Sequence, residues 1–108
     1  MGELAYHWAK ATQPQELNKA IEYALLAGDR ANQQLAPDEA VRWYDESLEL
    51  LQRQDPTNVN RRASLLVSLG DAQRQIGNPD YRETLLQAAH LASGAGDTPT
   101  LVLSLIHI

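Results

Sequence analysis

Two dipeptides and one glutamine recur in this chain at one shared spacing of about 42 residues. The recurring pairs are Gly28-Asp29 with Gly70-Asp71, Pro37-Asp38 with Pro79-Asp80, and Gln33 with Gln75. A fixed distance from a glycine to a later proline, kept in both copies, is typical of a duplicated helical hairpin. The pattern therefore predicts a tandem architecture, but it does not indicate a ligand.

The composition favours closely packed helices and argues against several classes of partner. Hydrophobic residues make up 44% of the chain, phenylalanine is absent, and most apolar residues are leucine and alanine. A formal charge of −5 argues against a nucleic-acid surface, which needs clustered lysine and arginine. The absence of cysteine excludes disulfides and thiolate chemistry. No signal peptide or membrane-spanning stretch is evident, so we expect a cytoplasmic location and no membrane partner.

Apolar residues recur every three or four positions between proline, glycine and asparagine breaks, which predicts five to six helices and an all-α fold. The expected helices cover 3–11, 15–34, 58–76 and 79–91. Another is expected to start within residues 36–39 and to stop at residues 55–58, and a sixth begins at Thr98. The residues expected to face inward are Leu17, Ala20, Ile21, Ala24, Ala27, Ala31 and Leu35, then Ala40, Val41, Tyr44, Leu48 and Leu51, then Leu65, Leu66, Leu69, Gly70 and Ile76, then Leu85, Leu86, Ala89 and Leu91.

The glycines have two expected roles. A glycine within a helix costs roughly 1 kcal/mol relative to alanine, so its recurrence at Gly28 and Gly70 predicts a close approach of the paired helix. Gly77 is expected to take a left-handed conformation at the end of a helix, and Asn78 to cap the helix that follows. The run from Gly94 to Asp97 is expected to end the fifth helix.

These spacings resemble the tetratricopeptide repeat. In that family a glycine in the first helix of each hairpin is followed by small residues and an aromatic in the second, and the positions here are Gly28, Ala40, Tyr44 and Ser47. The second copy departs from the pattern because Arg82 replaces the expected small residue, and the spacing exceeds the family's usual 34 residues. The resemblance implies a right-handed superhelix of antiparallel helical hairpins, formed by residues 1–102.

A narrower resemblance covers nearly the whole chain. The phrases that carry it are Leu4 to Trp8, Ala20 to Ala24, Ala27 to Ala31 and Ala36 to Ala40. They look like the repeat region of large bacterial signalling ATPases, namely LuxR-family (MalT-like) transcription regulators and ATPase-coupled adenylate cyclases. This resemblance implies a fragment whose ATP-binding and output parts lie elsewhere. No glycine-rich phosphate loop with lysine occurs in the sequence, in agreement with that expectation.

The last six residues, 103–108, resemble the in-frame translation of a transposon-end adapter used in sequencing libraries. We therefore expect this tail to be non-native. The alternative is a short apolar helix that continues from Thr100 to Val102.

Catalytic and metal chemistry have weak support in the sequence, and we expect neither an enzyme nor a cofactor. His7, His90 and His107 lack a second ligand at zinc spacing, and the serines Ser47, Ser64, Ser68 and Ser93 lack a histidine in a plausible motif. The acidic set Asp45, Glu46 and Glu49 is interpreted as a solvated helix face. The same interpretation is favoured over anion binding for Arg61, Arg62, Arg74 and Arg82.

The best candidate site is an interaction surface, because helical repeats bind partners along their successive first helices. Carrying the family's concave positions over from Gly28 gives Glu22, Leu25, Asp29, Asn32 and Gln33, and carrying them over from Gly70 gives Ser64, Val67, Asp71, Arg74 and Gln75. These amides and charges suit hydrogen bonds to an extended peptide or to a neighbouring domain of the parent chain.

The predicted function is a non-catalytic protein–protein interaction scaffold. As a hypothesis, the repeats hold the parent regulator inactive or sense an inducer, and a change in helix packing reaches the ATPase. Two alternatives stay open: a structural spacer or oligomerisation segment, and a fragment of an all-α enzyme.

Overall fold

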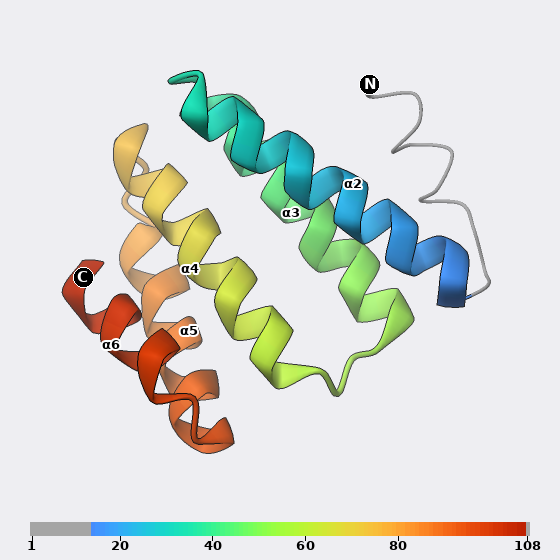
Figure 1. The fold of residues 1–108 in the computed structure, drawn as a ribbon. Helices are drawn as coiled ribbons and strands as arrows, with labels where there is room; N and C mark the ends of the chain where they lie inside the picture. The colour runs from blue at the N-terminus through green and yellow to red at the C-terminus, as the bar shows by residue number, and fades with distance from the viewer. Residues whose placement is uncertain (1–13, 108) are drawn as a thin grey trace. The chain divides into compact units, whose positions relative to one another are not determined.

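The computed structural model describes residues 14–107, and within that range the fold is all-α, with five helices and no strand. The helices are α2 (Pro14–Gln33), α3 (Pro37–Gln54), α4 (Val59–Gln75), α5 (Tyr81–Ala95) and α6 (Thr98–His107) (Figure 1). The chain divides into two compact units, Met1–Pro56 and Thr57–Ile108. The expected helix over 3–11 lies outside the described residues. The expected superhelix depends on how the units are arranged and stays a prediction.

In the first unit α2 packs against α3, as the prediction of a helical hairpin implied. Pro37 occupies the first turn of α3, where its missing N–H has no partner to lose, and Asp38 and Glu39 favour the positive end of the helix dipole. The almost fully buried side chains of the two helices are mostly small or branched. Those of α2 are Leu17, Ala20, Ile21, Ala24, Ala27 and Ala31, and those of α3 are Ala40, Tyr44, Leu50 and Leu51.

The turn between α2 and α3 corrects the expectation for Leu35. The backbone N–H of Ala36 donates to the carbonyl of Ala31 at 2.9 Å, which closes the end of α2 and places Leu35 at φ 59°, in the left-handed region. Leu35 therefore lies beyond the helix with 87% of its surface exposed, and it is not part of the inward stripe.

The second unit contains α4, α5 and α6, with α5 packed against both other helices. Asn58 caps α4 by accepting a hydrogen bond from the backbone N–H of Arg61 at 3.1 Å. At the other end, the N–H of Asn78 donates to the carbonyl of Gln73 at 2.9 Å, and Gly77 takes φ 75° as predicted. This closure corresponds, about 42 residues further along, to the one around Leu35.

Both predicted close approaches of glycine are confirmed. A Cβ atom placed on Gly28 would lie 2.8 Å from Cε1 of Tyr44 and 3.2 Å from Cβ of Trp43. A Cβ placed on Gly70 would lie 2.7 Å from both Cγ and Cδ2 of Leu85. In each unit, therefore, the second helix approaches the first at a point where only a glycine leaves enough room.

The start of α5 differs from the expectation. Asn78 does not cap the helix at Pro79; its side-chain oxygen accepts from the N–H of Asp80 at 3.0 Å, which holds Pro79 and Asp80 in a turn. The helix begins at Tyr81 and continues through Gly94 to Ala95. Gly96, at φ 73°, is the residue that ends it.

Of the four residues expected to face inward from α5, one is exposed. Leu85, not Leu86, faces Gly70, and Leu86 is 52% exposed. The expectation that Ile76 faces inward is also wrong, because Ile76 follows the last residue of α4 and is exposed. The other inward residues are buried or half-buried.

A sixth helix was expected from Thr98, and α6 begins there. Asp97 caps it, accepting from the N–H of Thr100 at 3.2 Å and from the Thr100 hydroxyl at 2.7 Å. The helix runs past Val102 to His107, which is the conformation that the alternative for the tail anticipated. The non-native origin of residues 103–108 stays a prediction.

Candidate functional site

The five residues predicted on the first unit all reach solvent from one side of α2. Glu22, Asp29 and Gln33 are exposed, and Leu25 and Asn32 are half-buried. Their spacing of three, four and seven residues places them side by side on the helix. We call this set (Glu22, Leu25, Asp29, Asn32 and Gln33) the α2 strip.

Near its N-terminal end, the α2 strip is linked to the last turn of α3. The side-chain amide of Gln54 donates to Oδ1 of Asn18 at 3.3 Å, and Nδ2 of Asn18 donates to Oε1 of Glu22 at 3.4 Å. Both bonds are long and only partly shielded from water, so they orient Glu22 weakly.

Asp29 is held more firmly, by a side chain from the core of the hairpin. The hydroxyl of Tyr44 donates to Oδ1 of Asp29 at 2.6 Å, while the Tyr44 residue itself is 2% exposed. A hydrogen bond to an ionised acceptor is short and strong, and here the donor is fixed by packing against Gly28. The second carboxylate oxygen has no hydrogen-bond donor among residues 14–107.

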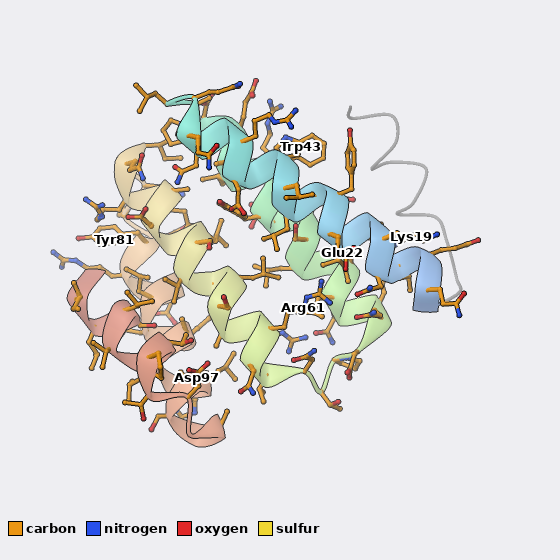
Figure 2. All side chains as sticks on the ribbon, in the orientation of Figure 1. Lys19, Glu22, Trp43, Arg61, Tyr81 and Asp97 are labelled. Atoms are coloured by element: carbon orange, nitrogen blue, oxygen red, sulfur yellow. The ribbon has the colours of Figure 1, made fainter. Side chains whose placement is uncertain are left out.

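Beside this contact, Trp43 and Tyr23 form an aromatic pair between α3 and α2. Their ring centroids are 6.2 Å apart and the rings are nearly perpendicular, in an edge-to-face arrangement. Trp43 lies beside α2 in Figure 2. Both rings are half-buried, so Trp43 packs at the hairpin interface.

The five residues predicted on the second unit occupy the corresponding side of α4. Ser64, Arg74 and Gln75 are exposed, and Val67 and Asp71 are half-buried. We call this set (Ser64, Val67, Asp71, Arg74 and Gln75) the α4 strip.

The charged side chains of the α4 strip interact with each other. Arg74 donates to Oδ1 of Asp71 at 2.8 Å, and the side-chain amide of Gln75 donates to Oδ2 of Asp71 at 3.1 Å. Because the Arg74 side chain is 47% exposed, this ion pair adds little to the free energy of unfolding. Its effect is electrostatic: the negative charge of Asp71 is matched within the strip.

The two strips therefore differ in charge. The α2 strip has two carboxylates and no basic residue, and neither Glu22 nor Asp29 forms an ion pair with any residue of the described range. The α4 strip contains one carboxylate and one guanidinium in contact. Asp29 and Asp71 occupy equivalent places in the sequence, but among the residues that the structure describes only Asp71 has a cationic partner.

The acidic set Asp45, Glu46 and Glu49 lies on the solvent side of α3, with Asp45 and Glu49 exposed and Glu46 half-buried. Partial burial of its carboxyl raises the pKa of Asp45 above its ordinary value. Within the part of the chain that the structure describes, no three His, Asp or Glu side chains come together as metal ligands.

All four candidate anion-binding arginines have interaction partners within the chain. Arg74 contacts Asp71, while Nε of Arg82 donates to the hydroxyl of Tyr81 at 3.2 Å. The Arg82 guanidinium also lies 5.8 Å from the centroid of that ring. Among the serines, Ser47 is fully buried and donates to the carbonyl of Trp43 at 2.9 Å. None of these contacts builds an anion site.

Sequence reasoning missed two polar contacts that fix the hairpins. One is the bond between Tyr44 and Asp29. The other joins the buried side chains of Gln73 and Thr84, whose oxygens Oε1 and Oγ1 lie 2.7 Å apart. The Thr84 hydroxyl also lies 3.1 Å from the carbonyl of Asp80, and its single proton cannot serve both acceptors fully. An amide turned so that Nε2 of Gln73 donates to Thr84 satisfies both groups.

Comparisons with family models, with curated proteins and with solved structures found no match to this chain. No helix in the described range is both long enough and apolar enough to cross a bilayer.

Proposed function

We propose that this chain is a non-catalytic interaction segment that contacts a protein or peptide partner through the α2 and α4 strips. One observation carries the proposal: each strip lies on a helix that packs closely against its neighbour at a glycine. Each strip presents polar side chains on a helix whose opposite side is fixed against its neighbour. Rigid helices with exposed hydrogen-bonding groups suit recognition of an extended segment.

The correspondence between the hairpins supports a tetratricopeptide-like repeat. The close approaches at Gly28 and Gly70, and the closures around Leu35 and Gly77, recur at about the same spacing. In such an array each hairpin contacts chiefly its neighbours, and first helices line a shared surface. A right-handed superhelix is the arrangement that we propose.

The resemblance of the repeat phrases supports a place in a larger bacterial regulator. We propose that the segment belongs to a cytoplasmic signalling or transcription-regulating ATPase. There it would sense a partner or restrain the ATPase until a partner binds.

Selection of binders from a random peptide library tests the proposed surface directly. We expect selected peptides to bind the protein and to lose at least tenfold in affinity against a strip variant. The strip variant combines Asp29→Asn, Gln33→Ala, Asp71→Ala and Arg74→Ala. Asparagine is chosen at position 29 because its side-chain oxygen can still accept the Tyr44 hydrogen bond, whereas alanine would remove this acceptor.

The matched control changes four exposed residues that lie outside both strips: Asp38→Ala, Arg42→Ala, Glu49→Ala and Glu83→Ala. Its affinity should equal that of the unaltered protein, and circular dichroism should show the same helix content for all three. Failure to select any peptide, or equal losses in both variants, would contradict the proposal. In that event a monomer in sedimentation experiments would favour the spacer.

A further inference from the structure

The charge difference between the strips indicates what kind of segment the first unit recognises. We propose that the α2 strip binds an extended basic segment with two lysine or arginine side chains three residues apart, one on Glu22 and one on Asp29. This inference rests on the proposed function and adds the chemistry of the partner.

Both carboxylates of the α2 strip lack a cationic partner among residues 14–107. Asp29 accepts from a neutral hydroxyl, so its full negative charge remains available, and Tyr44 fixes the orientation of the carboxylate. Asp71, at the equivalent place on α4, is matched by Arg74 and Gln75. A cation would therefore gain more at Asp29 than at Asp71.

The distance between the two carboxylates of the α2 strip suits an extended partner. Glu22 and Asp29 are two helical turns apart, which at 1.5 Å per residue is about 10 Å. A polyproline-type extended chain rises about 3.1 Å per residue with three residues per turn, so residues three apart lie on one face at about 9 Å. A β-strand would place residues three apart on opposite faces. The carboxylates thus match a lysine-x-x-lysine pattern in the first conformation.

The remaining members of the strip fit the same partner. Leu25 lies between the two carboxylates along the helix and is half-buried, so it offers a small apolar contact to the residues between the lysines. Gln33 continues the strip beyond Asp29 and is exposed, so its amide can hydrogen-bond the backbone of an extended chain, whose polar groups have no internal partners.

Fluorescence anisotropy with three labelled peptides tests the inference. The first has two lysines three residues apart in a proline- and alanine-rich background, the second has the lysines two residues apart, and the third has glutamine at both lysine positions. We expect the first to bind about fivefold more tightly than either control, and more weakly as salt screens the charges.

Variants of the protein locate the contact. Glu22→Gln and Asp29→Asn should each weaken binding of the first peptide about fivefold, whereas Glu83→Gln, a control at an exposed carboxylate of the second unit that lies outside both strips, should leave it unchanged. Tyr44→Phe should reduce the preference for lysine over glutamine without changing helix content, because Asp29 loses its fixed orientation.

Equal losses for Asp29→Asn and Glu83→Gln, or equal affinity for the lysine and glutamine peptides, would overturn the inference. If library-selected peptides still depend on the strips while the lysine peptide does not bind, the partner is not basic, and the proposed function stands. If no library peptide binds either, both the proposed function and this inference are contradicted.

Discussion

At the scale of single residues, the left-handed backbone of Leu35 is the clearest departure from what a leucine prefers. The left-handed conformation costs a non-glycine residue roughly 1–2 kcal/mol. The equivalent turn after α4 has Gly77, and the turn after α5 has Gly96. Leu35 gains no compensating burial, because most of its surface is exposed.

We therefore expect Leu35→Gly to raise the free energy of unfolding by about 1 kcal/mol. The measurement is urea denaturation followed by circular dichroism. Gly77→Ala is the matched control, since nothing lies within 4 Å of a Cβ at that position and only the backbone changes. It should lower the free energy of unfolding by a similar amount. A loss of stability in Leu35→Gly would mean that the leucine side chain contributes packing that outweighs its backbone strain.

Residue-level prediction from the sequence succeeded where one residue type has one physical role. Gly28, Gly70 and Gly77 behave as expected because close approach and positive φ both select glycine. It failed at Leu35, whose helical spacing suggested burial although the chain had already turned. It also missed the Tyr44–Asp29 bond, because residues from two helices come together only after packing.

At the scale of elements, α3 and α5 begin differently although both are preceded by the same Pro-Asp dipeptide. Pro37 follows an alanine and enters the helix, whereas Pro79 follows Asn78, whose side chain binds the N–H of Asp80 and holds a turn. The sequence pattern placed the N-terminal ends of α2, α3, α4 and α6 within about one residue. It placed the start of α5 at Pro79 instead of Tyr81, because a side-chain hydrogen bond outweighed the preference of proline for a first turn.

The contact between α4 and α5 gives the second prediction. Gly70→Ala places a methyl group 2.7 Å from Cγ of Leu85, a fully buried branch point that cannot move aside like the end of a flexible chain. Overpacking of this kind costs about 1–3 kcal/mol and exceeds the gain in helix propensity of about 1 kcal/mol. We expect a net loss of about 1 kcal/mol in the free energy of unfolding, measured by thermal or urea denaturation.

Gly94→Ala is the control for that substitution. Gly94 lies within α5, and no atom lies within 4 Å of a Cβ there, so only helix propensity changes. This variant should be more stable than the unaltered protein by up to about 1 kcal/mol. If Gly70→Ala were stabilised to the same extent, the close approach of Leu85 would not be a constraint on the fold.

At the scale of the whole molecule, acidic residues outnumber basic ones by 14 to 9. Binding to nucleic acid depends on releasing counterions from many phosphates, which requires clustered cations. We expect no change in the anisotropy of a labelled 20-base-pair DNA duplex at about 50 mM salt and micromolar protein. A salt-dependent increase would contradict that expectation and would direct attention to Arg61 and Arg62.

Fold class follows from the sequence at this scale because helical periodicity and breakers are local properties. The strips were likewise predictable, since spacing along one helix decides which side chains share a side. The difference in charge balance between the two strips was not predictable. Asp29 and Asp71 acquire their partners only where Tyr44 and Arg74 reach them in the folded chain.

The solvent-facing turn at Leu35 has a practical consequence in a chain without cysteine. One thiol can be introduced at Leu35 and another at exposed Pro79, which follows the equivalent turn after α4. These two thiols would be the sole sites for maleimide or nitroxide labels. Pulsed dipolar spectroscopy on that doubly labelled protein would then measure the distance between the two labels, one in each hairpin.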